Sequence, residues 1–170
     1  MERVFAALAF VTFAAFVFVG CDSAGDPAGD GGDTATHALV GTWTGTWTDT
    51  QYSATGSMSI SVTQTGSSLA GTGSIDLSSI GRGASNSGTA GGTISGEAVS
   101  FTFTAGTVGS GSGTISGTSV TGSGTSAPLG FGPFTFTATI DTAATPNILF
   151  GTFDFTDPTG GIGTASLTKQ

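Results

Sequence analysis

The chain has 170 residues, of which 82 are Gly, Ser or Thr, and it has a formal net charge of −8 with only three Lys+Arg. This length suits one domain, or one domain with a tail. The lack of basic residues argues against binding to nucleic acid or to anionic lipid headgroups, since both need a basic surface. A single Cys excludes an internal disulfide framework and a multi-Cys metal site, and the shortage of Glu, Lys, Leu and Arg excludes a helical bundle.

Residues 1–20 have the pattern of a signal peptide. The uncharged apolar run at 4–19 is shorter than the roughly 20 residues that a helix needs to span a bilayer. The run ends in Gly20-Cys21, which resembles the lipobox of bacterial lipoproteins, in which the Cys sulfur receives a diacylglyceryl group and the signal is cut just before it. The resemblance implies lipidation of Cys21 and an anchor in the bacterial cell envelope, with the outer membrane or cell surface favoured over the inner membrane. A plain membrane anchor and an ordinary secretory signal are the alternatives.

Residues 22–38 have the composition of a flexible tether. Four Asp lie among Gly, Ala and Pro without apolar periodicity, so the segment cannot bury enough surface to offset the entropy of ordering. A calcium loop is the alternative use of these acids, but the EF-hand spacing is absent and no Glu closes a cage. We therefore expect no metal site, and we divide the chain into a signal peptide at 1–20, the lipidated cysteine with the tether at 21–38, and a β-barrel domain at 39–170.

From residue 39 onward, apolar residues alternate with Thr and Ser. In 42–48, Trp43 and Trp47 fall on one face and four threonines on the other. Strict alternation of this kind predicts strands with one buried face and one wetted face. In chain order, we expect strands at 42–48, 57–63, 69–77, 88–95, 98–104, 109–116, 118–124, 134–140, 147–155 and 162–168.

These eight to ten short strands predict an all-β fold, an antiparallel meander that closes into a small up-and-down barrel. Closure removes the two bare edges that a meander of this length otherwise leaves. A transmembrane barrel would need apolar side chains facing lipid, whereas the expected outer face here is Thr and Ser. A flexible low-complexity linker would not place its Phe, Trp and Ile residues in register on one face.

A weak internal repeat marks the expected turns. Residues 92–99 resemble 113–120, and 62–69 is a looser third copy. Each copy places Gly where a tight hairpin needs a positive φ. The stretch 105–130 is nearly devoid of large side chains, which predicts an edge hairpin there that is either thin or mobile.

The two ends of the domain resemble those of the calycin superfamily of lipocalin-like and avidin-like barrels. In that family a Gly-x-Trp begins the first strand, and a basic residue on the last strand packs over the tryptophan. Gly41, Trp43 and Lys169 match these positions. The resemblance implies that the three residues close one end of the barrel, where a cation over a Trp ring contributes about 0.5–2 kcal/mol. The avidin branch uses further tryptophans for biotin, so with only Trp43 and Trp47 we expect no biotin site.

The sequence offers no catalytic constellation. His37 is the only histidine and falls in the expected tether, which excludes a Ser-His-Asp site inside the barrel, and Cys21 is assigned to lipid. The acids of the domain are interpreted as solvated turn or strand-end residues. They are Asp49, Asp76, Glu97, Asp141, Asp154 and Asp157. We expect a protein that is not an enzyme and uses no cofactor.

Two non-catalytic functions remain. In the first, the barrel binds a small apolar ligand; in the second, its aromatic side chains fill the interior and the outer surface or a loop contacts a partner. The candidate lining residues for a ligand are Trp47, Phe101, Phe103, Phe134, Phe136 and Phe150. Thr rows such as 42–50 also resemble ice-binding surfaces, but the curvature of a small barrel favours ordinary exposed-strand threonine.

Overall fold

The computed structural model describes residues 36–81, 86–95, 98–105, 109–125, 133–156 and 161–170. The expected signal peptide, Cys21 and most of the expected tether lie outside these residues, as do Glu97 and Asp157. In the described part of the chain, no helix has both the length and the apolar character that crossing a membrane requires.

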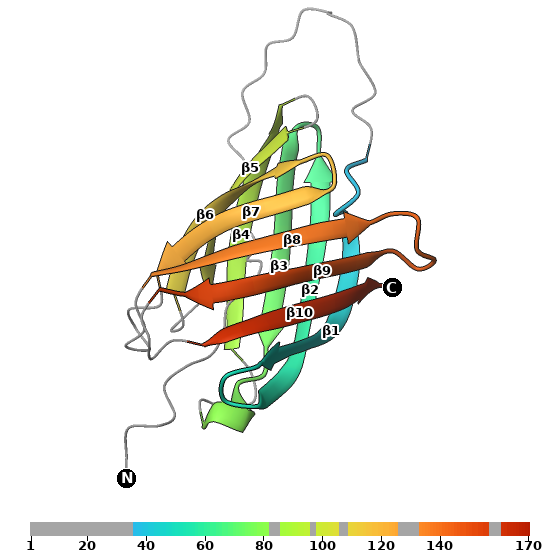
Figure 1. The fold of residues 1–170 in the computed structure, drawn as a ribbon. Coiled ribbons are helices and arrows are strands. Elements are labelled where there is room, and N and C mark those ends of the chain that lie inside the picture. The colour runs from blue at the N-terminus through green and yellow to red at the C-terminus, as the bar shows by residue number, and fades with distance from the viewer. Residues whose placement is uncertain (1–35, 82–85, 96–97, 106–108, 126–132, 157–160) are drawn as a thin grey trace, which may run out of the picture.

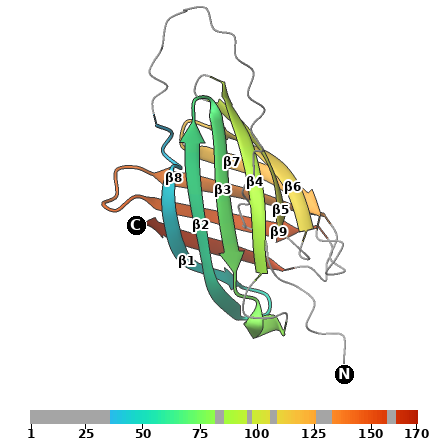
Figure 2. The same cartoon turned by 180° about the vertical axis from the view of Figure 1, so that it is seen from behind.

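Ten antiparallel strands and one short 3-10 helix make up the described fold. Each strand pairs with the next along the chain, and β1 (Gly41–Asp49) also pairs with β10 (Ile162–Lys169), so the sheet closes into a barrel (Figures 1 and 2). The elements between them are β2 (Ala54–Thr65), β3 (Ser68–Ile75), η1 (Ser78–Ile80), β4 (Asn86–Ser95), β5 (Ala98–Ala105), β6 (Gly109–Ser116), β7 (Ser119–Thr125), β8 (Pro133–Asp141) and β9 (Ile148–Phe155).

The fold class predicted from the alternation is confirmed. Each strand expected from the sequence is present, and the number of strands is at the upper limit of the expected range. The largest difference concerns β2, which the alternation predicts at 57–63 and which spans Ala54–Thr65. It is longer because its pairing with β1 continues beyond the alternating segment, as far as the pair of Ala54 with Asp49.

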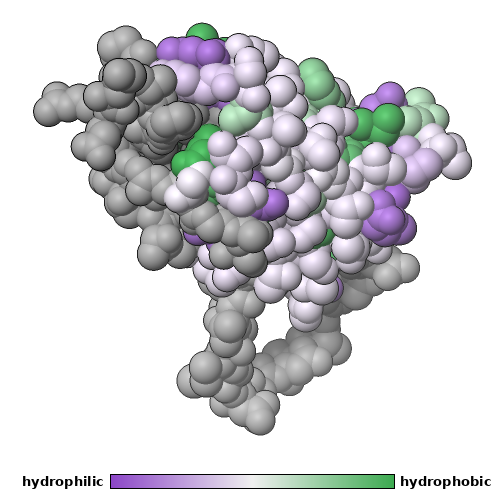
Figure 3. Space-filling view, turned by 90° about the horizontal axis from the view of Figure 1, so that it is seen from below, coloured by the Kyte–Doolittle hydropathy of each residue, from purple (hydrophilic) through white to green (hydrophobic). Residues whose placement is uncertain are grey.

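Side chains alternate between the barrel interior and solvent. In β8, Phe134, Phe136 and Ala138 are buried, and the threonines between them are exposed. Outward hydroxyls hydrogen-bond across neighbouring strands, as in Thr137 and Thr152, whose Oγ1 atoms are 3.0 Å apart. The face seen in Figure 3 is accordingly mostly pale, with only scattered strongly hydrophilic or hydrophobic residues.

Inward glycines of β6 and β7 lie beneath aromatic rings of the neighbouring strands. Phe134 of β8 is directly opposite Gly124 of β7, and a Cβ built on this glycine would lie 2.5 Å from the Cζ atom of the ring. Phe101 of β5 and Gly113 of β6 form the same kind of pair. The rings cover backbone that has no side chain of its own. Four further pairs share this arrangement: Phe103 with Gly111, Phe136 with Gly122, Phe153 with Gly163, and Trp47 with Gly56.

The prediction of a thin edge hairpin in 105–130 is wrong. Strands β6 and β7 pair with each other and also with β5 and β8, so neither of them is an edge. The sequence is misleading here because the bulk that fills the interior beside β6 and β7 belongs to phenylalanines of the adjacent strands. Glycine at the inward positions leaves the room that those rings occupy.

The barrel has two ends, which we name after the β1 residues that face the interior there. At the Trp43 end, Trp43 is paired with Lys169 of β10, and at the Asp49 end, Asp49 is paired with Gly163. The Asp49 end also carries the β1–β2 connection and η1 (Figure 1).

Glycine turns join strands at the Trp43 end, as the internal repeat predicts. Gly66 between β2 and β3 and Gly117 between β6 and β7 have φ values of 55° and 57°. This left-handed conformation suits glycine, which has no Cβ to clash with the backbone. The third hairpin glycine of the repeat, Gly96, lies outside the described residues.

Contacts with the barrel begin slightly before the expected domain boundary at residue 39. The backbone N–H of His37 donates a hydrogen bond of 2.8 Å to Oε1 of Gln64 on β2, and Val40 N–H donates to His37 O at 2.9 Å. The last residues assigned to the tether therefore belong to the domain.

Candidate functional site

Lys169 and Trp43 meet at the Trp43 end, as the calycin resemblance implies. They lie directly opposite each other on β10 and β1, and the Lys169 Nζ atom is 5.7 Å from the centroid of the buried Trp43 ring. Nζ also donates a hydrogen bond of 3.3 Å to Ala38 O, which ties the segment before β1 to the last strand. This geometry is that of a cation–π contact.

Gly41 leaves room for the aliphatic part of the Lys169 side chain. Its φ of 131° is a conformation that residues with side chains rarely adopt, and a Cβ at this position would lie 2.7 Å from Cε of Lys169. The glycine of the Gly-x-Trp pattern thus has a direct steric role beside Lys169.

The segment before β1 covers the Trp43 end. The Trp43 indole Nε1–H donates to Leu39 O at 2.8 Å, and Leu39 itself is only 3% exposed. Leu39 N–H donates to His37 Nδ1 at 3.3 Å. Partial burial lowers the pKa of His37, because the imidazolium form is less well hydrated there.

Five of the six candidate lining residues point into the barrel and contact other aromatic rings or the core. Trp47, Phe101, Phe103, Phe134 and Phe136 are between 0% and 7% exposed. The Phe103 and Phe136 ring centroids are 5.9 Å apart at a steep angle, and those of Phe101 and Phe136 are 6.2 Å apart. These are ordinary spacings for packed aromatic pairs.

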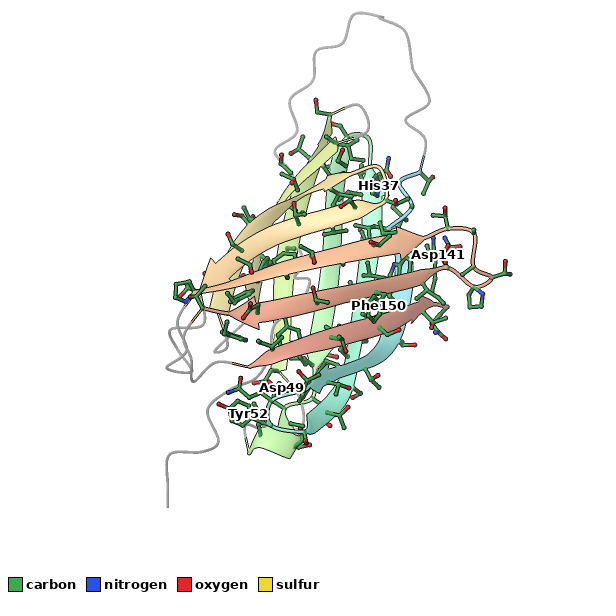
Figure 4. The ribbon with its side chains drawn as sticks, in the orientation of Figure 1. His37, Asp49, Tyr52, Asp141 and Phe150 are labelled. Atoms are coloured by element: carbon green, nitrogen blue, oxygen red, sulfur yellow. The ribbon has the colours of Figure 1, made fainter. Side chains whose placement is uncertain are left out.

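Phe150, the sixth candidate, does not line the interior. It lies on the outer face of β9 and is 50% exposed, whereas its neighbours Leu149 and Gly151 are buried (Figure 4). The prediction is wrong because Ile148, Leu149 and Phe150 form a continuous apolar run, and such a run does not reveal which residues face inward.

Phe153 and Phe155 are interior residues that were not among the six candidate lining residues. Both are on β9 and at most 4% exposed, and the Phe155 ring centroid lies 5.3 Å from that of Phe134. The alternation around Asp154, with a phenylalanine on each side, is the signal that could have found them.

In the described part of the chain, these side chains pack against one another across the interior. Most inward apolar side chains there are at most 7% exposed, and Ile94 of β4 is only partly buried. A cavity of about 470 Å³ lies along β3 to β6. Its lining includes outward residues such as Thr93 and Ser100, and also Leu69 and the candidate Phe101, whose side chains belong to the core.

Asp49 departs from the expectation of solvated acids. Its side chain faces the interior next to Ala54 and Gly163 in the strand register, and the residue is 0% exposed. Oδ1 accepts hydrogen bonds from the backbone N–H groups of Gln51 at 2.7 Å and Tyr52 at 2.8 Å. Oδ2 is buried and has no hydrogen-bond partner among the described residues. The burial of Asp49 could not be predicted from the sequence, because Asp is a common turn residue and its position at the end of β1 indicates only a turn.

The other described acids are as expected. Asp141 and Asp154 are exposed, and the Asp76 carboxylate accepts a hydrogen bond from Ser78 N–H at 2.8 Å, which lowers its pKa. Within the described ranges, no three His, Cys, Asp or Glu side chains are grouped so that they could hold a metal ion.

Comparisons of the chain with protein-family models, with curated proteins and with solved structures give no match. The closed antiparallel barrel is compatible with a calycin-like fold.

Proposed function

We propose that this protein is a lipid-anchored, non-enzymatic component of the bacterial cell envelope whose barrel acts through its outer surface and end loops. We favour the outer surface over an interior ligand site because aromatic rings pack across the barrel. Phe134 and Phe153, for example, are at most 1% exposed. An apolar ligand would have to displace rings that already contact one another.

The anchor is supported by the position of Cys21 at the end of the signal-like run. Each buried methylene of an acyl chain contributes about 0.8 kcal/mol, so one chain binds marginally and two hold stably. A tether of small and acidic residues would let the barrel stand off the membrane surface. We place the anchored protein in the outer membrane or at the cell surface.

A Cys21→Ala variant tests the anchor. We expect the variant to leave the membrane fraction and to lack the mass increment of acyl chains, while the matched Asp22→Asn variant keeps both. Intact-protein mass spectrometry and detergent partition measure this. Unchanged partition and unchanged mass in Cys21→Ala would overturn the anchor.

A ligand screen tests the filled interior. We expect unaltered protein to show no thermal stabilisation by small aromatic or fluorescent apolar probes, because packed aromatic rings occupy the described interior. Phe136→Ala is the positive control, since it opens an apolar cavity of a kind that can take up benzene. Stabilisation of the unaltered protein at micromolar probe concentration would instead favour the binding of a small apolar ligand.

A further inference from the structure

Asp49 is a carboxylate in a place where a carboxylate is costly. The side chain is fully buried at the Asp49 end, and Oδ2 has no hydrogen-bond partner among the described residues. Burying a polar oxygen without a partner costs free energy, and burying an ionised one costs considerably more. A group of this kind requires a physical explanation.

Turn formation does not explain the burial. Asp141 makes the same turn on the outside of the barrel, where its Oδ1 accepts from the N–H groups of Ala143 at 2.9 Å and Ala144 at 3.2 Å. These donors are two and three residues after the aspartate, as Gln51 and Tyr52 are after Asp49. The turn is therefore possible with the second oxygen in water, and the inward placement of Asp49 Oδ2 is a separate feature.

We propose that Asp49 is a proton-binding site that controls the Asp49 end of the barrel: the end is closed when Oδ2 carries a proton and opens at the β1–β2 connection when the carboxylate ionises. The chemistry is the exchange of one proton with water, which forms or breaks the Oδ2–H bond and needs no other reactant. The inference is independent of the lipid anchor.

The surroundings of Asp49 favour the protonated form. Burial raises the pKa of its carboxyl group, and the backbone N–H groups of Tyr52 and Gln51 oppose this only in part. On the paired strands, the residues opposite Asp49 are Ala54 and Gly163, which carry no charge.

The nearest described titratable groups do not neutralise this carboxylate. Tyr52 lies beside it on the β1–β2 connection (Figure 4). The Asp76 carboxylate accepts from Ser78 N–H, Asp154 is exposed on the outer face of β9, and Lys169 is at the opposite end. No cation among these described residues faces Asp49.

Ionisation should open the β1–β2 connection because this is where water can reach Oδ2 with the least rearrangement. The connection is four residues long, 50–53, and includes Ser53 at a strained positive φ of 54°. Trp47 lies two residues before Asp49 on the same face of β1, and its Nε1–H donates to Asp76 O at 3.0 Å. Opening would admit water toward this ring.

The direction of the pH effect follows from the raised pKa. The folded state holds the proton more tightly than the unfolded state does, so the stabilising contribution is full below the ordinary value of 3.8 and is lost as pH rises through the raised value. The Asp49 end is thus closed at low pH, where Asp49 is protonated.

Two measurements on the unaltered full chain test the proposal. The carboxyl ¹³C shift of Asp49 should titrate above the ordinary aspartate value of 3.8. Over the same range, amide exchange of Gln51 and Tyr52, corrected for its intrinsic pH dependence, should speed up at least tenfold, while Ala143 and Ala144 stay constant. An Asp49 titration at or below the ordinary value of 3.8, or equal behaviour of the two amide pairs, would overturn the proposal.

Matched variants give an independent readout. Asp49→Asn keeps the Oδ1 acceptor and cannot ionise, so exchange at residues 51 and 52 should no longer depend on pH. Asp141→Asn, the control, should keep the full pH dependence of the unaltered protein. Persistence of the pH dependence in Asp49→Asn would contradict the assignment, and if this variant does not fold, the carboxyl titration of the unaltered chain decides alone.

Discussion

At the scale of single residues, the absence of a Cβ at Gly41 determines how Lys169 closes the Trp43 end. Gly41 lacks the Cβ that would meet the stem of Lys169, and this lets the ammonium group lie over Trp43 and reach Ala38 O. A Gly-x-Trp pattern is short and common, but the steric relation between Gly41 and Lys169 links the first and last strands of the fold.

Lys169→Met removes the charge at this end while keeping most of the stem. We expect the free energy of unfolding to fall by about 0.5–2 kcal/mol, the range for a partly desolvated cation–π contact. Chemical denaturation followed by Trp fluorescence measures the change. Lys169→Arg, which keeps a cation, should lose less, and an equal loss in both variants would show that the charge has no role.

At the scale of the elements, the pairing of phenylalanine with glycine across neighbouring strands explains the composition of β6 and β7. Each of the two strands has two inward glycines beside rings of a neighbouring strand. The rings of β5 cover those of β6, and the rings of β8 cover those of β7. Packing density is then a property of strand pairs and cannot be assessed one strand at a time.

Gly124→Ala tests this pairing, because its Cβ would lie 2.5 Å from both Cζ of Phe134 and the Ser110 carbonyl oxygen. We expect a loss of about 1–3 kcal/mol in the free energy of unfolding, as for other overpacked cores. Ser123→Ala, outward on the same strand, should change it by about 0.5 kcal/mol or less. A double variant with Phe134→Leu should be less destabilised than the sum of the two single changes, and simple additivity would contradict the proposed contact.

Sequence patterns predicted the elements well and individual side chains less well. Strict alternation identified four strands, because a period of two is a local property that one buried face imposes, and the six further candidate segments correspond to the other strands. The orientation of Phe150 was not predictable from an unbroken apolar run, and the burial of Asp49 depends on strands β2 and β10, which are distant along the chain. The contact of Lys169 with Trp43 was accessible only through the calycin resemblance, since the two residues are 126 positions apart.

At the scale of the whole molecule, the two ends of the barrel should respond to pH in opposite directions. Burial lowers the pKa of His37 at the Trp43 end, so its stabilising contribution is present above the ordinary value of 6.5 and is lost as pH falls through the lowered value. Asp49 at the other end has the opposite sign.

Exchange of the Trp43 indole N–H, which donates to Leu39 O, reports on the Trp43 end. We expect this exchange, corrected for its intrinsic pH dependence, to accelerate as pH falls below the ordinary histidine value of 6.5, because protonated His37 favours water over its partly buried site. His37→Gln should remove this acceleration. Equal acceleration in the variant would show that another group controls this end.

The pairing of β1 with β10 also brings the first and last described segments to the same end of the barrel. Gln170 N–H donates to Thr42 O at 2.8 Å, so the chain enters and leaves the barrel at the same rim, the Trp43 end. In the anchored protein proposed above, the tether would join the barrel at that rim, and the β1–β2 connection and η1 are at the opposite rim. A reporter fused to Gln170 would therefore be at the rim that the tether joins, while one inserted at 50–53 would be at the other rim.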